Sequence, residues 1–168
     1  ESAFFVSVMI KHSEVRNRIL ETAGRLFYSQ GYNSTGTNQI IAEAMVAKAS
    51  WYQHFPTKED LLVEYLKTTS LNTIDTIKRI VDAKETSLEK VKGVFEYLNK
   101  FSKQNAYNGC AFLNIASEVC QGNTRAMKVI QNQKDGIRKI FKEILQAITR
   151  EELTDQFYLL FEGALIAS

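Results

Sequence analysis

The stretch "IIAEAMVAKASWYQHFPTKEDLL", residues 40–62, decides the fold because its apolar residues do not follow one continuous helical stripe. They form short runs that are interrupted near Met45 and again at Pro56. Proline lacks a backbone N–H and disfavours the helical conformation of the residue before it, so a helix ends before Pro56. The pattern therefore predicts two short helices, over residues 38–45 and 47–55, and then a long helix that Thr57 begins.

The 47–55 helix has two different faces. Trp51 and Phe55 lie about 40° apart around its axis and define the face that we expect to be buried. The opposite face is small and polar, and it can enter a DNA major groove about 12 Å wide. Two helices joined by a tight turn, the second with a polar outer face, form a helix-turn-helix, although ordinary packing helices give a similar pattern. The outer face and its edges carry Ala49, Ser50, Tyr52, Gln53 and His54, with Lys48 in the first turn.

The helix over residues 38–45 supplies Ile40, Ile41 and Ala44 as its buried side. Thr37 can cap this helix. Thr37 and Asn38 can donate hydrogen bonds to a phosphate, where the helix dipole also favours an anion.

Outside this stretch the chain is expected to be all-α. It has one proline and lacks runs of alternating β-branched residues. A first helix carries the stripe Val15, Ile19, Ala23, Leu26 and Phe27, and it ends before Gly31. In "TKED", Thr57 and Asp60 resemble a capping box, with Lys58 in the first turn of the helix that follows. The long helix spans residues 58–84, and further helices are predicted over residues 87–103, 109–121, 124–149 and 151–168.

The totals constrain the function only weakly. The 168 residues include 21 basic and 19 acidic side chains, a net charge of +2 that neither requires nor excludes a nucleic-acid partner. Cys110 and Cys120, if they share one helix, lie about 15 Å apart along it and cannot bridge each other. Two buried thiols are the simpler interpretation, and a redox sensor is the alternative. No apolar run approaches the ~20 residues of a membrane span, and "ESAFFVSVMI" is a poor signal peptide, so we expect a cytoplasmic protein without membrane contact.

On these residues the sequence resembles the TetR/AcrR family of bacterial transcription regulators. The similar segments are "ILETAGRLFYSQGYNSTGTNQIIAEA" and "VAKASWYQHFPTKEDLLVEYL", and the run of Tyr52, His54, Phe55, Lys58 and Leu61 is specific to the family. Farther along, "NGCAFLNIASEV" resembles a pattern of the ligand-binding domain in one branch, and "LLFEGALIAS" resembles a late dimer-forming helix. The resemblance implies a homodimer that binds double-stranded operator DNA and a small-molecule effector.

The resemblance also implies roles for individual residues. Lys48, Ala49, Ser50, Tyr52, Gln53 and His54 fall on the recognition helix, while Thr37 and Lys58 fall on positions that hold the DNA backbone; Asn38 completes the expected DNA-binding set. Two features depart from the family. Met45 stands where glycine is usual because the backbone there tends toward positive φ, at a cost of about 1 kcal/mol. The chain ends at Ser168, where the family has one more helix at its dimer interface, and the join at "QAITREEL" is short.

Other classes of function fit the sequence less well. Gly31 and Gly36 have the separation of a phosphate-binding loop, but no lysine follows Gly36 and no strand precedes the loop. An enzyme needs a base, a nucleophile or a metal site, yet the only histidines are His12 and His54, and neither H-x-x-x-H nor C-x-x-C occurs. We therefore predict neither an enzyme, nor a metal site, nor a cofactor.

The second half of the chain is rich in aromatic residues. For any single ring, core packing is the simpler explanation. For the set, the resemblance implies a cavity among the helices of residues 58–150, and an apolar lining suits a lipophilic or aromatic effector. The expected ligand-binding residues are Tyr65, Phe95, Leu98, Phe101, Phe112, Asn114 and Phe161, and the aromatic set also includes Tyr97, Tyr107 and Phe157.

The sequence therefore predicts an all-α regulator with a helix-turn-helix DNA-binding domain over residues 9–57 and a ligand-binding and dimerisation domain over residues 58–168. Each protomer would place its 47–55 helix in the major groove, at half-sites about 34–36 Å apart. The effector would act through the 58–84 helix, which begins at the DNA and runs into the bundle. The alternative is a small-molecule-binding helical bundle with a degenerate DNA-binding head, for which Met45 is the suggestive residue.

Overall fold

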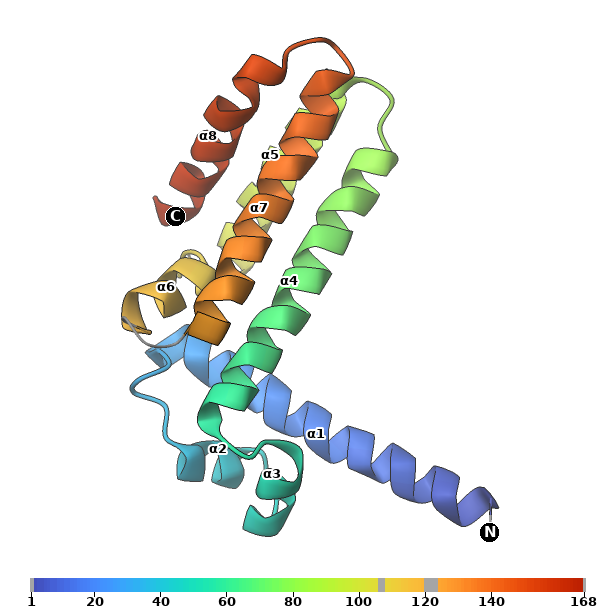
Figure 1. Cartoon of the computed structure of the whole chain (residues 1–168), viewed down its shortest axis with the longest axis vertical. Helices are drawn as coiled ribbons and strands as arrows, with labels where there is room; N and C mark the ends of the chain where they lie inside the picture. Colours follow the sequence, from blue (N-terminus) through green and yellow to red (C-terminus); the bar gives the residue numbers. More distant parts are fainter. Residues whose placement is uncertain (1, 106–107, 120–123, 168) are drawn as a thin grey trace. The chain divides into compact units, whose positions relative to one another are not determined.

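The computed structural model describes residues 2–105, 108–119 and 124–167, and all regular elements in these ranges are helical (Figure 1). The all-α prediction is confirmed. The chain divides into two compact units, unit 1 up to Tyr65 and unit 2 from Leu66 onward, so one continuous helix, α4, contributes to both. The elements are α1 (Ser2–Gln30), α2 (Thr37–Glu43), α3 (Lys48–His54), α4 (Lys58–Asp82), α5 (Ser87–Gln104), α6 (Ala111–Glu118), α7 (Thr124–Gln146), the 3-10 turn η1 (Glu151–Leu153) and α8 (Thr154–Ile166).

Each predicted helix is present, and most differences lie at helix ends. The helix expected over residues 109–121 is shorter, because Cys110 is the residue before α6 and not part of it. The segment expected as one helix over residues 151–168 begins with the tighter η1 turn before α8. Tyr107 and Cys120 lie outside the described residues, as does the break expected at residues 122–123. The predicted domain boundary after residue 57 stays a prediction beside the division at residue 65.

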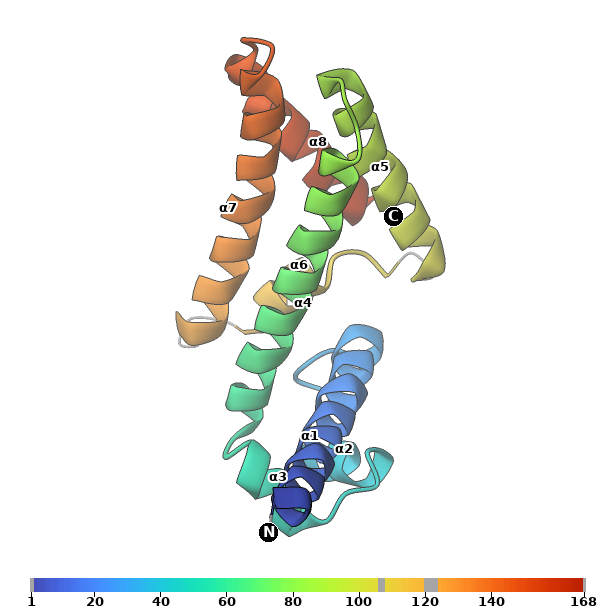
Figure 2. The ribbon, with the colours of Figure 1, turned by 90° about the vertical axis from the view of Figure 1, so that its right-hand side faces the viewer.

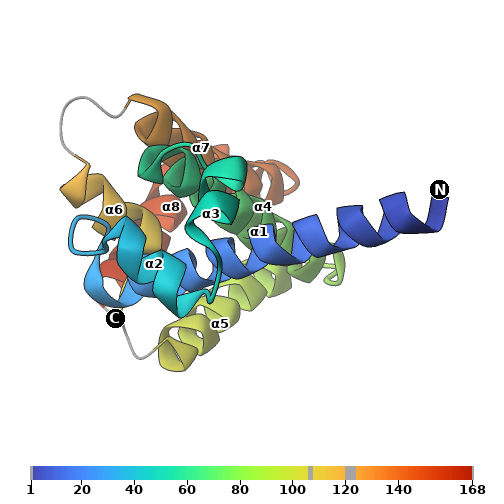
Figure 3. The ribbon, with the colours of Figure 1, turned by 90° about the horizontal axis from the view of Figure 1, so that it is seen from below.

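Unit 1 packs α2 and α3 against α1, with the first turns of α4 completing the group (Figure 3). Its core contains the predicted stripe of α1 from Ile19 to Phe27, while Val15 is only half-buried. Ile40 and Ala44 are buried as expected, but Ile41 is half-buried because it lies at the edge of the packed face of α2. Gly24 lets α4 come close to α1: a Cβ at this position would lie 2.8 Å from the Tyr65 ring.

Unit 2 is built around α5, α7 and α8, which contact one another pairwise (Figure 1, Figure 2). Phe141 of α7 is fully buried at the centre of a ring cluster. Its ring centroid lies 6.1 Å from that of Phe95, 6.3 Å from that of Phe157 and 5.9 Å from that of Phe161. Aromatic packing of this kind joins the three helices through one side chain.

The turn between α2 and α3 has the geometry that the family resemblance predicted. Met45 has a φ of 52°. Its N–H donates to the Ala42 carbonyl at 3.1 Å, and the Val46 N–H donates to the Ile41 carbonyl at 3.2 Å. These two bonds are those of a Schellman motif, in which a left-handed residue ends the helix and satisfies its last carbonyls. Met45 therefore carries a left-handed conformation that usually belongs to glycine, and its side chain is 79% exposed.

The short join after α7 uses the same device. Thr149 has a φ of 55°, its N–H donates to the Gln146 carbonyl at 3.1 Å, and the Arg150 N–H donates to the Leu145 carbonyl at 3.0 Å. A left-handed residue reverses the chain direction within a few residues. The brevity of the "QAITREEL" segment is thus compatible with a connection from α7 to η1.

We expect Met45→Gly to stabilise the protein by about 1 kcal/mol, because glycine adopts the left-handed region without the Cβ penalty. The midpoint of urea unfolding measures this effect. Met45→Ala is the matched control, since it also removes the exposed side chain but keeps the Cβ. A glycine variant no more stable than the alanine variant would show that the turn carries no strain.

Candidate nucleic-acid interface

Helix α3 is held by its inner face. Trp51 is fully buried, Phe55 is 3% exposed, and their ring centroids lie 6.2 Å apart. A seven-residue helix is too short to be stable alone, so this burial determines both its formation and its orientation. The predicted inner face of this helix is confirmed.

The outer face of α3 is open to solvent. Lys48, Ala49 and Gln53 are exposed, and Tyr52 keeps 51% of its surface. Ser50 and His54 are half-buried at the edges. This face presents an ammonium, a carboxamide and hydroxyl groups, which are the groups that hydrogen-bond to phosphates and to base edges.

The start of α2 differs from the prediction. The helix begins at Thr37 itself, and the residue before it, Gly36, forms no side-chain cap. Thr37 therefore lies in the first turn, half-buried, and does not cap the helix; Asn38 beside it is exposed. The hydroxyl that orders this loop belongs to Thr35, which is fully buried and donates to the Gly31 carbonyl at 2.6 Å.

A chain of polar contacts ties α2 to α1. Arg25 pairs with Glu43 at 2.6 Å, Gln39 donates to Glu43 at 2.9 Å, and Gln30 donates to Gln39 at 2.9 Å. The hydrogen bonds from Arg25 and then Gln39 lower the pKa of the Glu43 carboxyl, which therefore stays ionised. Individually such exposed pairs stabilise little, but together they set the angle at which α2 leaves the loop.

Lys58 has a contact within unit 1 that sequence reasoning missed. Its Nζ donates to the Tyr32 carbonyl at 2.6 Å and lies 4.1 Å from the centroid of the Tyr32 ring. The ring of Tyr32 packs edge-on against that of Phe27, with centroids 5.3 Å apart. Burial, and secondly the charge of Glu59, raises the pKa of the Tyr32 hydroxyl. Lys58 thus connects the 31–36 loop to the start of α4, near the position where the family resemblance implies a phosphate.

The start of α4 shows half of the predicted capping box. The Thr57 hydroxyl accepts from the Asp60 N–H at 3.0 Å, which is the expected cap. The returning bond joins the Thr57 hydroxyl, as donor, to the Asp60 carboxylate at 2.7 Å. Aspartate is one methylene shorter than the usual glutamate, and this explains a bond to the hydroxyl. A complete capping box occurs instead at Thr86 and Glu89, and the missed signal was the T-x-x-E spacing before α5.

Arg16 is a second residue that the sequence did not reveal. It pairs with Glu64 of α4 at 2.6 Å, and its guanidinium lies 5.4 Å from the centroid of the Phe55 ring. One side chain of α1 therefore contacts both the residue that ends α3 and the start of α4. Its burial and pairing leave no local pattern in the sequence.

The predicted ligand-binding residues separate into two groups. Four of them, Leu98, Phe101, Phe112 and Phe161, line a cavity of about 60 Å³ in unit 2. The other three lie elsewhere: Tyr65 belongs to unit 1 and packs on Phe27 at 5.8 Å, Phe95 packs in the ring cluster of Phe141, and Asn114 is exposed and donates to the Asn108 carbonyl at 2.9 Å. The sequence did not select Thr69, Thr73, Cys110, Ala111, Gln133 and Leu165, and it placed Tyr97 only in the wider aromatic set; all seven also line the cavity.

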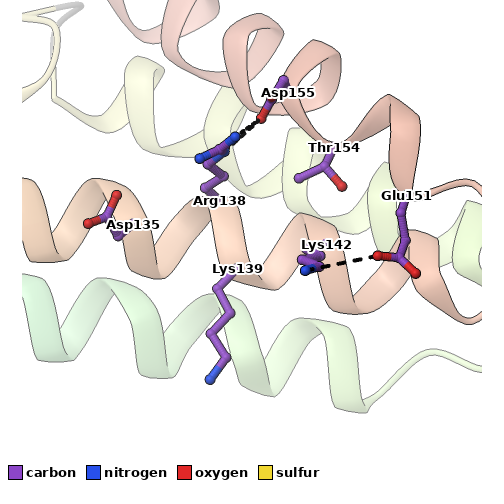
Figure 4. A pocket seen from close by; sticks show the side chains of 7 residues that line it. All are labelled: Asp135, Arg138, Lys139, Lys142, Glu151, Thr154 and Asp155. Atoms are coloured by element: carbon purple, nitrogen blue, oxygen red, sulfur yellow. Dashed lines mark hydrogen bonds and ion pairs between the residues drawn. The ribbon is translucent and has the colours of Figure 1, made fainter.

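A larger cleft of about 480 Å³ opens on the surface between α7 and the segment from η1 to the start of α8 (Figure 4). Arg138 pairs with Asp155 at 2.6 Å, and Lys142 lies 3.9 Å from Glu151. The hydrogen bond from Arg138 lowers the pKa of the Asp155 carboxyl. Because its cations face carboxylates of the same surface, the cleft is better explained as a clamp between α7 and α8 than as a ligand site.

Membrane spans and metal-ligand clusters are both absent from the described residues. No helix within these ranges has the length and apolar character needed to cross a bilayer. In the part of the chain that the structure describes, no three His, Cys, Asp or Glu side chains come together as metal ligands.

The helix-turn-helix region matches a known family. Residues 19–65 match bacterial regulatory proteins of the tetR family, and this match ends at the residue where unit 1 ends. The transcriptional regulator YxaF of Bacillus subtilis is 32% identical over 112 residues, which are 66% of this chain and 59% of YxaF. The regulator LmrA of the same organism is 36% identical over 98 residues, which are 56% of this chain and 50% of LmrA. The chain therefore spans little more than half the length of these curated relatives.

A solved structure extends the similarity to both units. SCO4454, a TetR-family transcriptional regulator from Streptomyces coelicolor, superposes with a TM-score of 0.87 and 26% identity, over 92% of this chain and 84% of SCO4454. The helix-turn-helix geometry, the family match over residues 19–65 and this shared fold agree. The chain belongs to the TetR family of regulators.

Proposed function

We propose that this protein is a homodimeric DNA-binding transcriptional repressor that leaves its operator when unit 2 binds a small lipophilic or aromatic effector. The observation that carries the proposal is α3: its inner face is buried through Trp51 and Phe55, while Lys48, Tyr52 and Gln53 face solvent. A helix held in this way can enter a major groove without losing contacts to its own domain.

The exposed groups divide into two tasks. Gln53 can pair with an adenine through two hydrogen bonds, and Ser50 and Tyr52 can reach neighbouring bases. Lys48, Lys58, Thr37 and Asn38 would contact phosphates, which give affinity but no sequence information. Two protomers would then read half-sites about 34–36 Å apart in the cytoplasm, where the DNA is.

The outer face of α8 supports the homodimer. Leu159, Leu160 and Ile166 are 65%, 61% and 67% exposed, and nothing lies within 4 Å of a Cβ built on Gly163. Residues three, four and seven positions apart share one side of a helix, so these positions form a continuous apolar strip. Such a strip suits the same strip of a second copy across a two-fold axis.

Effector control would run through α4. This helix starts at Lys58 in unit 1, and Thr69 and Thr73 on the same helix line the cavity of unit 2. Lys58 and Thr69 are about 16 Å apart along the helix axis at about 1.5 Å per residue. A coupling of about 1–3 kcal/mol between the two sites would change operator affinity by about 5- to 150-fold.

The alternative, a ligand-binding bundle with a degenerate DNA-binding head, rested on Met45. The turn at Met45 makes both hydrogen bonds of a Schellman motif, and α3 keeps its buried anchors. The observation that suggested this alternative therefore does not favour it.

Gln53→Ala should lower affinity for the operator about 10- to 100-fold, because a bidentate contact to a base is worth about 1–3 kcal/mol. Fluorescence anisotropy with labelled DNA from upstream of the protein's own gene measures the loss. The affinity for a scrambled duplex should not change. Gln131→Ala, at an exposed glutamine of α7, is the control. Equal losses on both duplexes would remove Gln53 from base recognition.

Lys58→Gln should reduce the slope of log affinity against log salt by about 1.8, because a dimer loses two phosphate contacts of about 0.9 each. The same anisotropy assay at several salt concentrations gives the slope. Lys103→Gln, at an exposed lysine of α5, should leave it unchanged. A loss of affinity with an unaltered slope would instead mean that Lys58 acts only by holding Tyr32.

Leu160→Glu should convert the dimer to a monomer without loss of folding, since it places a charge in the apolar strip at a solvent-exposed position. Sedimentation velocity measures the change in mass, and circular dichroism checks the fold. Leu71→Glu is the matched control, because Leu71 of α4 is 70% exposed. Retention of the dimer in Leu160→Glu would place the interface elsewhere.

A further inference from the structure

The interior of unit 2 contains a polar atom with an unmet need. Gln133 of α7 is 4% exposed, and its Oε1 is buried without a hydrogen-bond partner. The Oε1 atom of Glu162 in α8 is in the same condition. Nearly all buried polar groups in folded proteins are paired, because an unpaired group has given up its hydrogen bonds to water. Both of these atoms are acceptors, so what they lack is a donor.

The adjacent cation does not supply that donor. Lys134 Nζ lies 2.5 Å from Glu162 Oε2 and 3.5 Å from Cys110 Sγ, so its ammonium is directed to those two groups. Cys110 and Gln133 both line the cavity of unit 2. The unmet acceptor therefore belongs to a side chain in a cavity wall and not to a sealed packing defect.

The cavity has a definite size and character. Its volume of about 60 Å³ corresponds to roughly four to six waters at about 10–15 Å³ each, which is the space of a single small ring. Aromatic and aliphatic side chains, including Phe101, Phe112 and Phe161, form much of its wall. A water needs two to four polar partners to be held well, and such a wall favours an organic guest over a cluster of waters.

We propose that this cavity binds a small single-ring compound with one hydroxyl or amino group, and that this group donates a hydrogen bond to Gln133 Oε1. The inference rests on the proposed effector control and narrows the effector to a hydrogen-bond donor. The ring lies among Phe101, Phe112 and Phe161. The same compound contacts α4 at Thr69 and Thr73, which gives it a direct hold on the helix that starts at Lys58.

The test uses phenol and toluene, which differ by a hydroxyl in place of a methyl group. Isothermal titration calorimetry gives both dissociation constants for the full chain and for Gln133→Met, which keeps the length of the side chain but cannot accept the bond well. We expect the preference for phenol over toluene to fall at least tenfold in Gln133→Met. A site built around a hydrogen bond rejects the analogue that cannot form it. Gln131→Met, on the exposed side of the same helix, should keep the wild-type preference.

Three results would overturn the inference: an unchanged phenol-to-toluene preference in Gln133→Met, an equal change in Gln131→Met, or no binding of either compound by the wild-type chain. Thermal unfolding without ligand is a second readout. The unfolding midpoint of Gln133→Met should equal or exceed that of wild type, because the variant removes an unpaired acceptor. A clear fall in the midpoint would mean that Gln133 is satisfied in the folded protein.

Operator binding is measured separately, with and without phenol, by anisotropy. If the chain binds its operator but phenol shows no dependence on Gln133, this inference fails and the proposed function stands. If phenol binds through Gln133 and no operator binding is found, the DNA-binding role fails and the ligand site stands.

Discussion

The burial of Trp51 is the constraint on which the rest of unit 1 depends. Helix α3 has seven residues, and a helix of that length does not persist in water without tertiary support. Removing a tryptophan side chain from water contributes on the order of 4–6 kcal/mol, from its area of about 150–250 Å². Because Trp51 and Phe55 provide this on one side, the other side of α3 needs no contact with the protein. That freedom is what allows Gln53 and Tyr52 to face a partner.

Polar contacts then give the reading head its direction. Arg16 contacts the end of α3 and the start of α4, Lys58 holds the loop at Tyr32, and Arg25 holds α2 through Glu43. Exposed ion pairs of this kind are worth little each, and the apolar core supplies most of the stability. Their effect is geometric, since each one fixes an angle between two elements that the core alone would leave adjustable.

Unit 2 shows the opposite arrangement, with polar groups inside and an apolar strip outside. The Lys134–Glu162 pair is about 90% buried, and the cost of desolvating two charges offsets much of their attraction. Together with the unpaired Gln133 Oε1, it makes the centre of this unit less stable than an apolar core of the same volume would be. Interiors of this kind are retained where a guest or a change of state makes use of them. The two units thus divide the work physically: one holds a rigid outer face, and the other holds an interior that is incomplete without a partner.

What the sequence by itself determined is local. The helical period, the single proline at Pro56 and the turn chemistry around Met45 depend on neighbours a few residues away, so the all-α class, the two short helices and the inner face of α3 could be predicted. What only the tertiary structure decided is which side chains meet across large separations. Lys58 and Tyr32 are 26 positions apart, and the cavity wall collects residues from α4, α5, α7 and α8. Aromatic content predicted a cavity but placed Tyr65 and Phe95 in it, because the sequence shows that a ring is buried and not which neighbours bury it. Gln133 was missed for the same reason: a glutamine on a helix is ordinarily solvated, and only packing puts this one inside.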